Sequence, residues 1–103
     1  MIEQQRPLTG RLLQPRAATR HKLFEPIVMR MRGTPQRAHL LDLSVGGALV
    51  HCEAPPLAGA WLMIETTEFV SGARVVWVRA KRFGIQFDAP IADAIVQRMI
   101  RSP

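Results

Sequence analysis

Apolar and polar residues alternate along most of the chain after residue 26. The alternation first appears at Ile27, Met29 and Met31, which are separated by Val28 and Arg30. A period of two residues is typical of a β-strand that buries one face. We therefore predict six short strands, at about residues 26–32, 37–43, 48–52, 61–65, 73–78 and 83–87.

Turn-forming residues separate these strands. Gly33-Thr34-Pro35 predicts a turn, the segment 44–47 interrupts the next strand, and Ser71-Gly72 marks a break before the fifth. Trp61 and Trp77 lie on predicted strands, and the core is the first expectation for both large aromatic side chains. The alternative for Trp77 is a position near the mouth of the domain, where it would report on binding.

The period changes after Pro90 and predicts an amphipathic helix over about residues 90–101. Asp88 is a candidate N-cap, and Arg98 and Arg101 suit the negative C-terminal end of the helix dipole. The helix has more apolar residues than one stripe needs, which suggests burial of a part of it against a partner or a second copy. These residues are Ile91, Ala92, Ile95, Val96, Met99 and Ile100.

Six short strands and one helix predict an all-β domain, a small antiparallel barrel or curled sheet whose open side the helix covers. A chain of 103 residues has room for one such core. Residues 1–20 are polar, basic and interrupted by prolines, and we expect them to form a flexible arm. The predicted organisation is thus an arm over residues 1–20 and one domain over residues 21–103.

The positive charge is concentrated near the N-terminus. The net charge is +6, and residues 1–41 carry eight basic and two acidic side chains, whereas residues 42–103 carry six of each. Twelve of the fourteen cations are arginine, whose planar fork pairs bidentately with phosphate. The chain has no tyrosine and few other aromatic residues, which argues against a stacking platform for single-stranded nucleic acid.

Several classes of protein lack support in the sequence. No apolar run is long enough to span a bilayer, and the N-terminus shows no secretion signal, so we expect a cytoplasmic protein. Cys52 has no partner cysteine and is expected in the core, and the histidines show no metal-binding or catalytic spacing. We expect no enzyme activity, no metal and no cofactor.

Two short patterns carry candidate chemistry. Arg16 and Arg20 are four residues apart in the basic arm, where they can either converge on one ligand or remain solvated charges. Asp42 and Ser44 share one face of a strand, and Gly46-Gly47 follow them. These glycines allow positive φ angles and close approach of a ligand, although Asp, Ser and Gly are also ordinary turn residues.

In this order the two patterns resemble those of the PilZ domain family, RxxxR followed by [DN]xSxxG. The resemblance continues through Val75-Val76-Trp77 and Gly84-Ile85-Gln86-Phe87 and covers about residues 14–90. It implies a six-stranded antiparallel barrel with a C-terminal helix, which the periodicity also predicts.

The resemblance further implies binding of cyclic di-GMP, a bacterial second messenger with two phosphodiesters and two guanines. Arginines can pair with phosphate or with a guanine edge, and a carboxylate can accept hydrogen bonds from guanine. The candidate contacts are Arg16, Arg20, Asp42, Ser44 and Gly47, with Arg11, His21 and Gly46 as additional positions.

The sequence thus predicts a single-domain receptor for cyclic di-GMP that orders its arm on binding and signals through an unidentified partner protein. Two other functions stay open. One is an interaction module of the same fold that binds no nucleotide, and the other is a small basic barrel that binds RNA or DNA. Nothing in the sequence names the regulated process, the oligomeric state, the affinity or the number of ligands bound.

Overall fold

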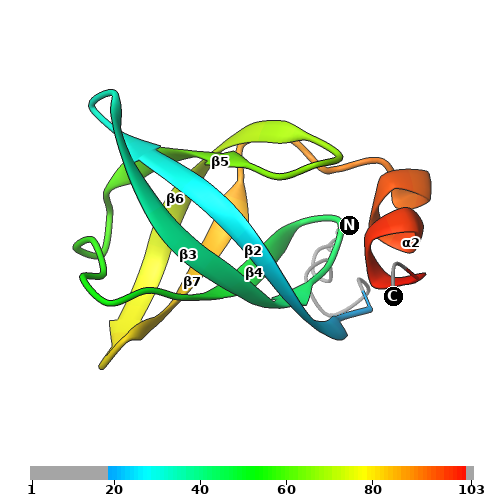
Figure 1. Cartoon of the computed structure of the whole chain (residues 1–103), viewed down its shortest axis with the longest axis horizontal. Coiled ribbons are helices and arrows are strands. Elements are labelled where there is room, and N and C mark those ends of the chain that lie inside the picture. The colour runs from blue at the N-terminus through cyan, green and yellow to red at the C-terminus, as the bar shows by residue number, and fades with distance from the viewer. Residues whose placement is uncertain (1–18, 102–103) are drawn as a thin grey trace, which may run out of the picture.

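The computed structural model describes residues 19–101. Six antiparallel strands form a closed barrel in the order β2-β3-β4-β7-β6-β5, and one helix follows the last strand (Figure 1). This architecture confirms the predicted six-stranded barrel with a C-terminal helix. The elements are β2 (His21–Met31), β3 (Thr34–Leu43), β4 (Gly47–His51), β5 (Trp61–Glu65), β6 (Val70–Arg79), β7 (Arg82–Phe87) and α2 (Asp93–Arg101).

The barrel closes where β2 pairs with β5. Residues Val28 to Arg30 lie opposite Met63 to Glu65 and join the first strand of the barrel to the fourth. The Arg30 guanidinium donates a hydrogen bond to the Glu65 carboxylate at this seam. Closure gives every strand two neighbours, which removes the open edges that sheets otherwise have to protect.

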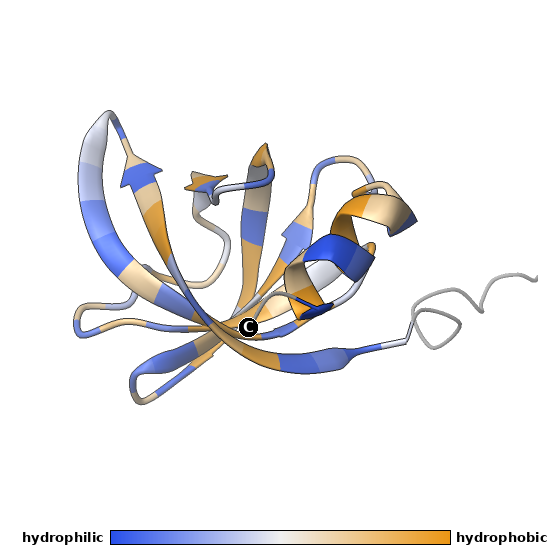
Figure 2. Cartoon of the chain, turned by 45° about the vertical axis from the view of Figure 1, so that its right-hand side comes forward, coloured by the Kyte–Doolittle hydropathy of each residue, from blue (hydrophilic) through white to orange (hydrophobic). Residues whose placement is uncertain are grey.

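The core follows the predicted alternation along most strands, as the bands of hydrophobic and hydrophilic residues in Figure 2 show. The prediction is confirmed for β5 and β7, in which the predicted alternate apolar residues are buried. Cys52 is also buried, as expected. The fully buried apolar residues include Met29, Leu40, Leu43, Val50, Leu62, Ile64, Val75, Phe83 and Val96.

The first two strands are longer than predicted. β2 begins at His21, five residues before the predicted start at Pro26. The turn after it consists of Arg32 and Gly33, whose φ angles of 53° and 82° form a two-residue hairpin connection. Pro35 therefore lies within β3, where its missing N–H group is tolerated because β3 pairs with β4 only from His39 onward.

The predicted break at Ser71-Gly72 is wrong, because both residues lie inside β6. The Trp61 indole covers Gly72, where an added Cβ would lie 2.6 Å from Trp61 Cζ2. The predicted core position of Trp61 is also wrong, since its side chain is 49% exposed. Leu62 points inward, so Trp61 must point outward, and its Nε1–H donates to the Asp88 carboxylate at 2.7 Å.

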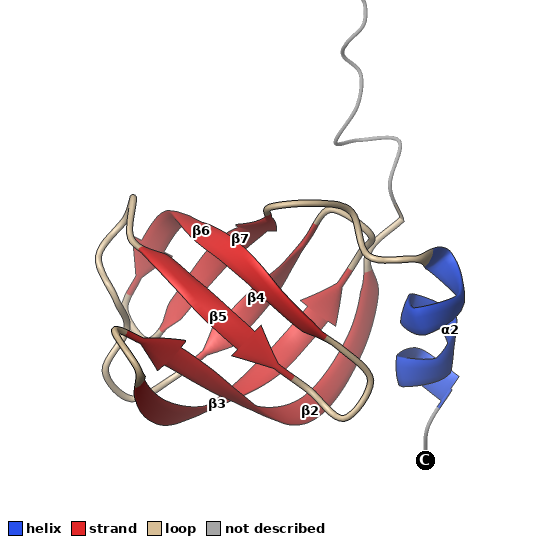
Figure 3. Cartoon of the chain, turned by 90° about the horizontal axis from the view of Figure 1, so that it is seen from above, coloured by secondary structure: helices blue, strands red, loops and turns tan. Residues whose placement is uncertain are grey.

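Helix α2 covers one mouth of the barrel (Figure 3). It begins at Asp93, later than predicted, and Asp88 does not cap it because that carboxylate is bonded to Trp61. Val96 and Met99 are buried against the barrel, and Arg98 forms an ion pair with Glu68. Much of the apolar excess noted in the sequence therefore belongs to the core.

Candidate ligand-binding site

Strand pairing places the second motif on the outer wall of the barrel. Cross-strand neighbours connect Asp42 to Leu49, Leu49 to Gly84, and Gly84 to Trp77. These four residues form one row that crosses β3, β4, β7 and β6. The row places Asp42 on the same face of the sheet as Trp77, which lies near the C-terminal end of β6.

A β-bulge turns Asp42 outward. Leu40 and Leu43 both point into the core, although they are three residues apart, and the register of β3 against β4 shifts between Leu40 and Asp42. An extra residue in one strand changes the face that the following side chains occupy. Asp42 is held there because its Oδ1 accepts a hydrogen bond from the Leu49 backbone N–H at 2.9 Å.

Arg20 and Asp42, one residue from each motif, lie together. Arg20 Nη1 is 3.5 Å from Asp42 Oδ2. The aspartate side chain is only 16% exposed, whereas that of the arginine is 69% exposed. An ion pair of this kind adds at most about 1 kcal/mol to stability. The guanidinium can therefore exchange its partner for an incoming anion at little energetic cost.

Ser44 shapes the turn between β3 and β4. Its backbone N–H donates to the Gly47 carbonyl at 2.9 Å. Its hydroxyl lies 3.2 Å from both the Gly47 N–H, which donates to it, and the Gly47 carbonyl, to which it donates. The side chain is buried, so the serine fixes the connection that follows Asp42.

The two glycines of the motif have different surroundings. A Cβ at Gly47 would lie 2.2 Å from the Ile85 carbonyl oxygen, whereas nothing lies within 4 Å of a Cβ at Gly46. Gly47 thus permits close approach of β4 to the β7 backbone. Neither residue adopts the positive φ that glycine allows, because among residues 19–101 only Gly33 and Gly59 are glycines with that conformation.

A hollow of about 420 Å³ lies beside the Arg20–Asp42 pair. Three guanidinium groups surround it, and Leu49 and Trp77 supply its apolar wall. The two sequence motifs include none of Leu49, Arg79 and Arg82. Their common location follows from the pairing of β4 with β7, for which the sequence gives no direct signal. The lining residues are Arg20, Leu49, Trp77, Arg79 and Arg82.

Trp77 lies outside the barrel, and its predicted core position is wrong. Val75 is buried, but the register of β6 against β7 shifts between Val75 and Trp77, and the indole is 42% exposed. The indole packs on Gly84, where an added Cβ would lie 2.3 Å from Trp77 Nε1. The glycine therefore provides the space that holds the aromatic ring flat against the barrel wall.

The other candidate positions differ in what the structure shows of them. Arg11 and Arg16 lie outside the described residues. His21 begins β2 opposite Leu43 and is half-buried. The Gly46 carbonyl oxygen accepts a hydrogen bond from the Phe87 N–H at 2.9 Å.

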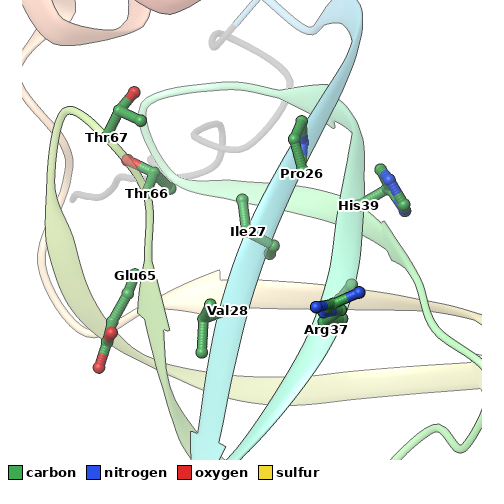
Figure 4. Close-up of a pocket in the computed structure, with 9 residues that line it drawn as sticks. Pro26, Ile27, Val28, Arg37, His39, Glu65, Thr66 and Thr67 are labelled. Atoms are coloured by element: carbon green, nitrogen blue, oxygen red, sulfur yellow. The ribbon is translucent and has the colours of Figure 1, made fainter.

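A second hollow, of about 550 Å³, lies over β2, β3 and the turn after β5 (Figure 4). Its charged lining residues are Arg37 and Glu65, and Glu65 already pairs with Arg30. It therefore lacks the concentration of positive charge that marks the hollow beside Asp42.

Burial raises the pKa of the Cys52 thiol, and the Gln36 amide lies 3.0 Å from its sulfur. A raised pKa keeps the thiol protonated and unreactive near neutral pH. Within residues 19–101, no three His, Cys, Asp or Glu side chains come together as metal ligands. In the same range, no helix has the length and apolar character required to cross a membrane.

Fold and site together define a class of protein, a small closed β-barrel with an arginine-lined hollow on its outer wall. The model of the PilZ domain family matches residues 14–102, and the chain belongs to this family. PilZ domains typically bind cyclic di-GMP and are generally receptors without catalytic activity. No curated protein matches the chain.

Proposed function

We propose that this protein is a receptor for cyclic di-GMP and that the ligand occupies the hollow beside Asp42. The observation that carries the proposal is the ion pair between Arg20 and Asp42 at the edge of that hollow. It unites a residue of each sequence motif at one place on the barrel. Membership of the PilZ family supports the same ligand.

The chemistry of these residues suits a cyclic dinucleotide. Arg16 and Arg20 each offer a guanidinium fork for a phosphodiester or for the O6 and N7 atoms of guanine. Asp42 is an acceptor for the N1–H and N2–H₂ groups, which guanine presents together. Because Leu49 already orients the carboxylate, binding would need little rearrangement at this side chain.

Trp77 adds an aromatic surface to the proposed site. Its indole is partly exposed at the hollow and is held flat by Gly84. Purine rings stack on such surfaces, and a stacked base contributes about 1–3 kcal/mol when measured by removal of the aromatic side chain. We assign to Trp77 the stacking of one guanine of the ligand.

We propose that the remaining residues of the second motif act on binding through the shape of the turn. Ser44 and Gly47 form the turn that positions Asp42, so they contribute to binding through that geometry. Gly46 leaves open space next to the turn, where a ligand can approach the backbone. Arg11 and His21 are additional candidate contacts.

We propose that the protein signals through a partner and not by catalysis. The sequence predicts a flexible arm over residues 1–20, which carries Arg16 and ends beside the hollow at Arg20. Ligand binding would order this arm against the barrel and change the surface that a partner protein contacts. The energy spent on ordering the arm would lower the affinity for the ligand.

Calorimetric titration with cyclic di-GMP tests the proposal, with GTP and GMP as control ligands. We expect a dissociation constant of about 10 μM or lower, which corresponds to about −7 kcal/mol. The Arg16→Ala/Arg20→Ala double variant and the Asp42→Ala variant should each lose binding. Absence of binding by the unmodified protein at several hundred micromolar ligand would contradict the proposal.

A further inference from the structure

The hairpin formed by β6 and β7 supplies two of the arginines that line the hollow, and β4 separates these strands from β3, where Asp42 pairs with Arg20. Arg79 and Arg82 are direct cross-strand partners, and both are exposed. Like charges that lie directly opposite each other destabilise a pair of strands. Within residues 19–101, no carboxylate forms an ion pair with either arginine. Within the described barrel, the repulsion between the two arginines is therefore not relieved by an ion pair.

The tip of this hairpin is anchored to the rest of the barrel. The Lys81 carbonyl oxygen accepts a hydrogen bond from the Cys52 N–H at 2.9 Å, and the Lys81 ammonium pairs with Glu53 at 2.7 Å. Lys81 is thereby engaged with the segment after β4. Arg79 and Arg82, which flank this anchored turn, line the hollow.

The positive charge at the hollow consequently comes from two parts of the fold. Arg20 lies beside Asp42 of β3, whereas Arg79 and Arg82 belong to β6 and β7. Leu49 and Trp77 provide the apolar surface of the same hollow. This arrangement fits a ligand that carries two anionic groups joined by flat or apolar parts.

We propose that Arg79 and Arg82 form a second phosphate-binding position, which holds the phosphodiester of cyclic di-GMP that the arginine motif does not neutralise. The inference rests on the proposed function, since it concerns the same ligand in the same hollow. Paired guanidinium groups provide several N–H donors for one phosphate and form strong charge-assisted hydrogen bonds with it. The bound phosphate would also remove the repulsion between the two arginines.

The test compares the Arg79→Gln/Arg82→Gln variant with an Arg37→Gln/Arg101→Gln control. Both variants lose two positive charges, but Arg37 and Arg101 do not line this hollow. In calorimetric titrations with cyclic di-GMP, we expect the hairpin variant to bind at least tenfold more weakly than the unmodified protein. The dissociation constant of the control variant should stay within about threefold of that of the unmodified protein. Because both variants lose the same net charge, the control measures the general effect of charge on the affinity.

Urea unfolding of the same proteins separates binding from folding. Removal of the like-charge pair should leave the hairpin variant as stable as the unmodified protein, or more stable. Equal affinities of the hairpin variant and the control would overturn the inference. A weaker affinity that accompanies a loss of stability would overturn it too, because the arginines would then act on the fold. If the unmodified protein itself binds no cyclic di-GMP, the proposed function fails, and the inference fails with it.

Discussion

At the scale of single residues, two adjacent glycines of one motif have separate roles. Gly47 lies against the backbone of β7, and any side chain there would collide with the Ile85 carbonyl group. Gly46 lies in open space. The motif glycine is therefore required for the barrel itself, because it lets β4 and β7 pair next to the turn that positions Asp42.

We expect Gly47→Ala to destabilise the protein by about 1–3 kcal/mol, since backbone atoms have to move to admit the added Cβ. Gly46→Ala is the matched control, and it should be neutral or stabilising by up to about 1 kcal/mol because alanine restricts the unfolded chain. Urea unfolding monitored by circular dichroism measures both changes. Equal stability of the two variants would show that β4 can move away from β7 without cost.

At the scale of elements, β-bulges decide which residues line the site. One bulge precedes Asp42 in β3, and another precedes Trp77 in β6. The period of two residues predicted the buried faces of β5 and β7 correctly, because neither face depends on a bulge. It failed for Trp77, since a single extra residue reverses the side to which the following residues point.

The motifs predicted part of the site, and the sheet topology supplied the rest. The family resemblance placed Arg20 and Asp42 among the contacts of one ligand, and the two residues form an ion pair. The motifs could not add Arg79 and Arg82, because the barrel places β4 next to β7 and so joins segments that are distant in the chain. Strand order in a closed barrel depends on long-range pairing, which local patterns of residues do not specify.

Helix α2 stabilises the protein because it covers one mouth of the barrel. Met99 is 4% exposed, and its sulfur lies 3.8 Å from the Thr66 hydroxyl. We expect Met99→Ala to cost about 2–4 kcal/mol, as is usual when a buried methionine leaves a cavity. Arg101→Ala, at an exposed position of the same helix, should change stability by less than about 0.5 kcal/mol. Thermal unfolding measures the stability of both variants. An equal loss of stability in the two would mean that the helix does not seal the core.

At the scale of the whole molecule, folding redistributes the positive charge. The sequence concentrates its excess in residues 1–41, but the barrel brings Arg20 to the same hollow as Arg79 and Arg82 from the neutral half. The site thus has more local positive charge than either motif alone provides. In our account, the barrel presents a fixed face, and the segment before β2 completes the site when ligand arrives.

The two tryptophans permit the most direct test of this account. Trp77 lies at the hollow, whereas Trp61 packs over Gly72 and donates to Asp88. In a nuclear magnetic resonance titration with cyclic di-GMP, we expect the indole N–H signal of Trp77 to shift and that of Trp61 to stay in place. The backbone amide signals of Leu49 and Gly84 should move with Trp77. A shift of Trp61 with Trp77 unchanged, or no shift of either signal, would contradict the placement of the ligand in this hollow.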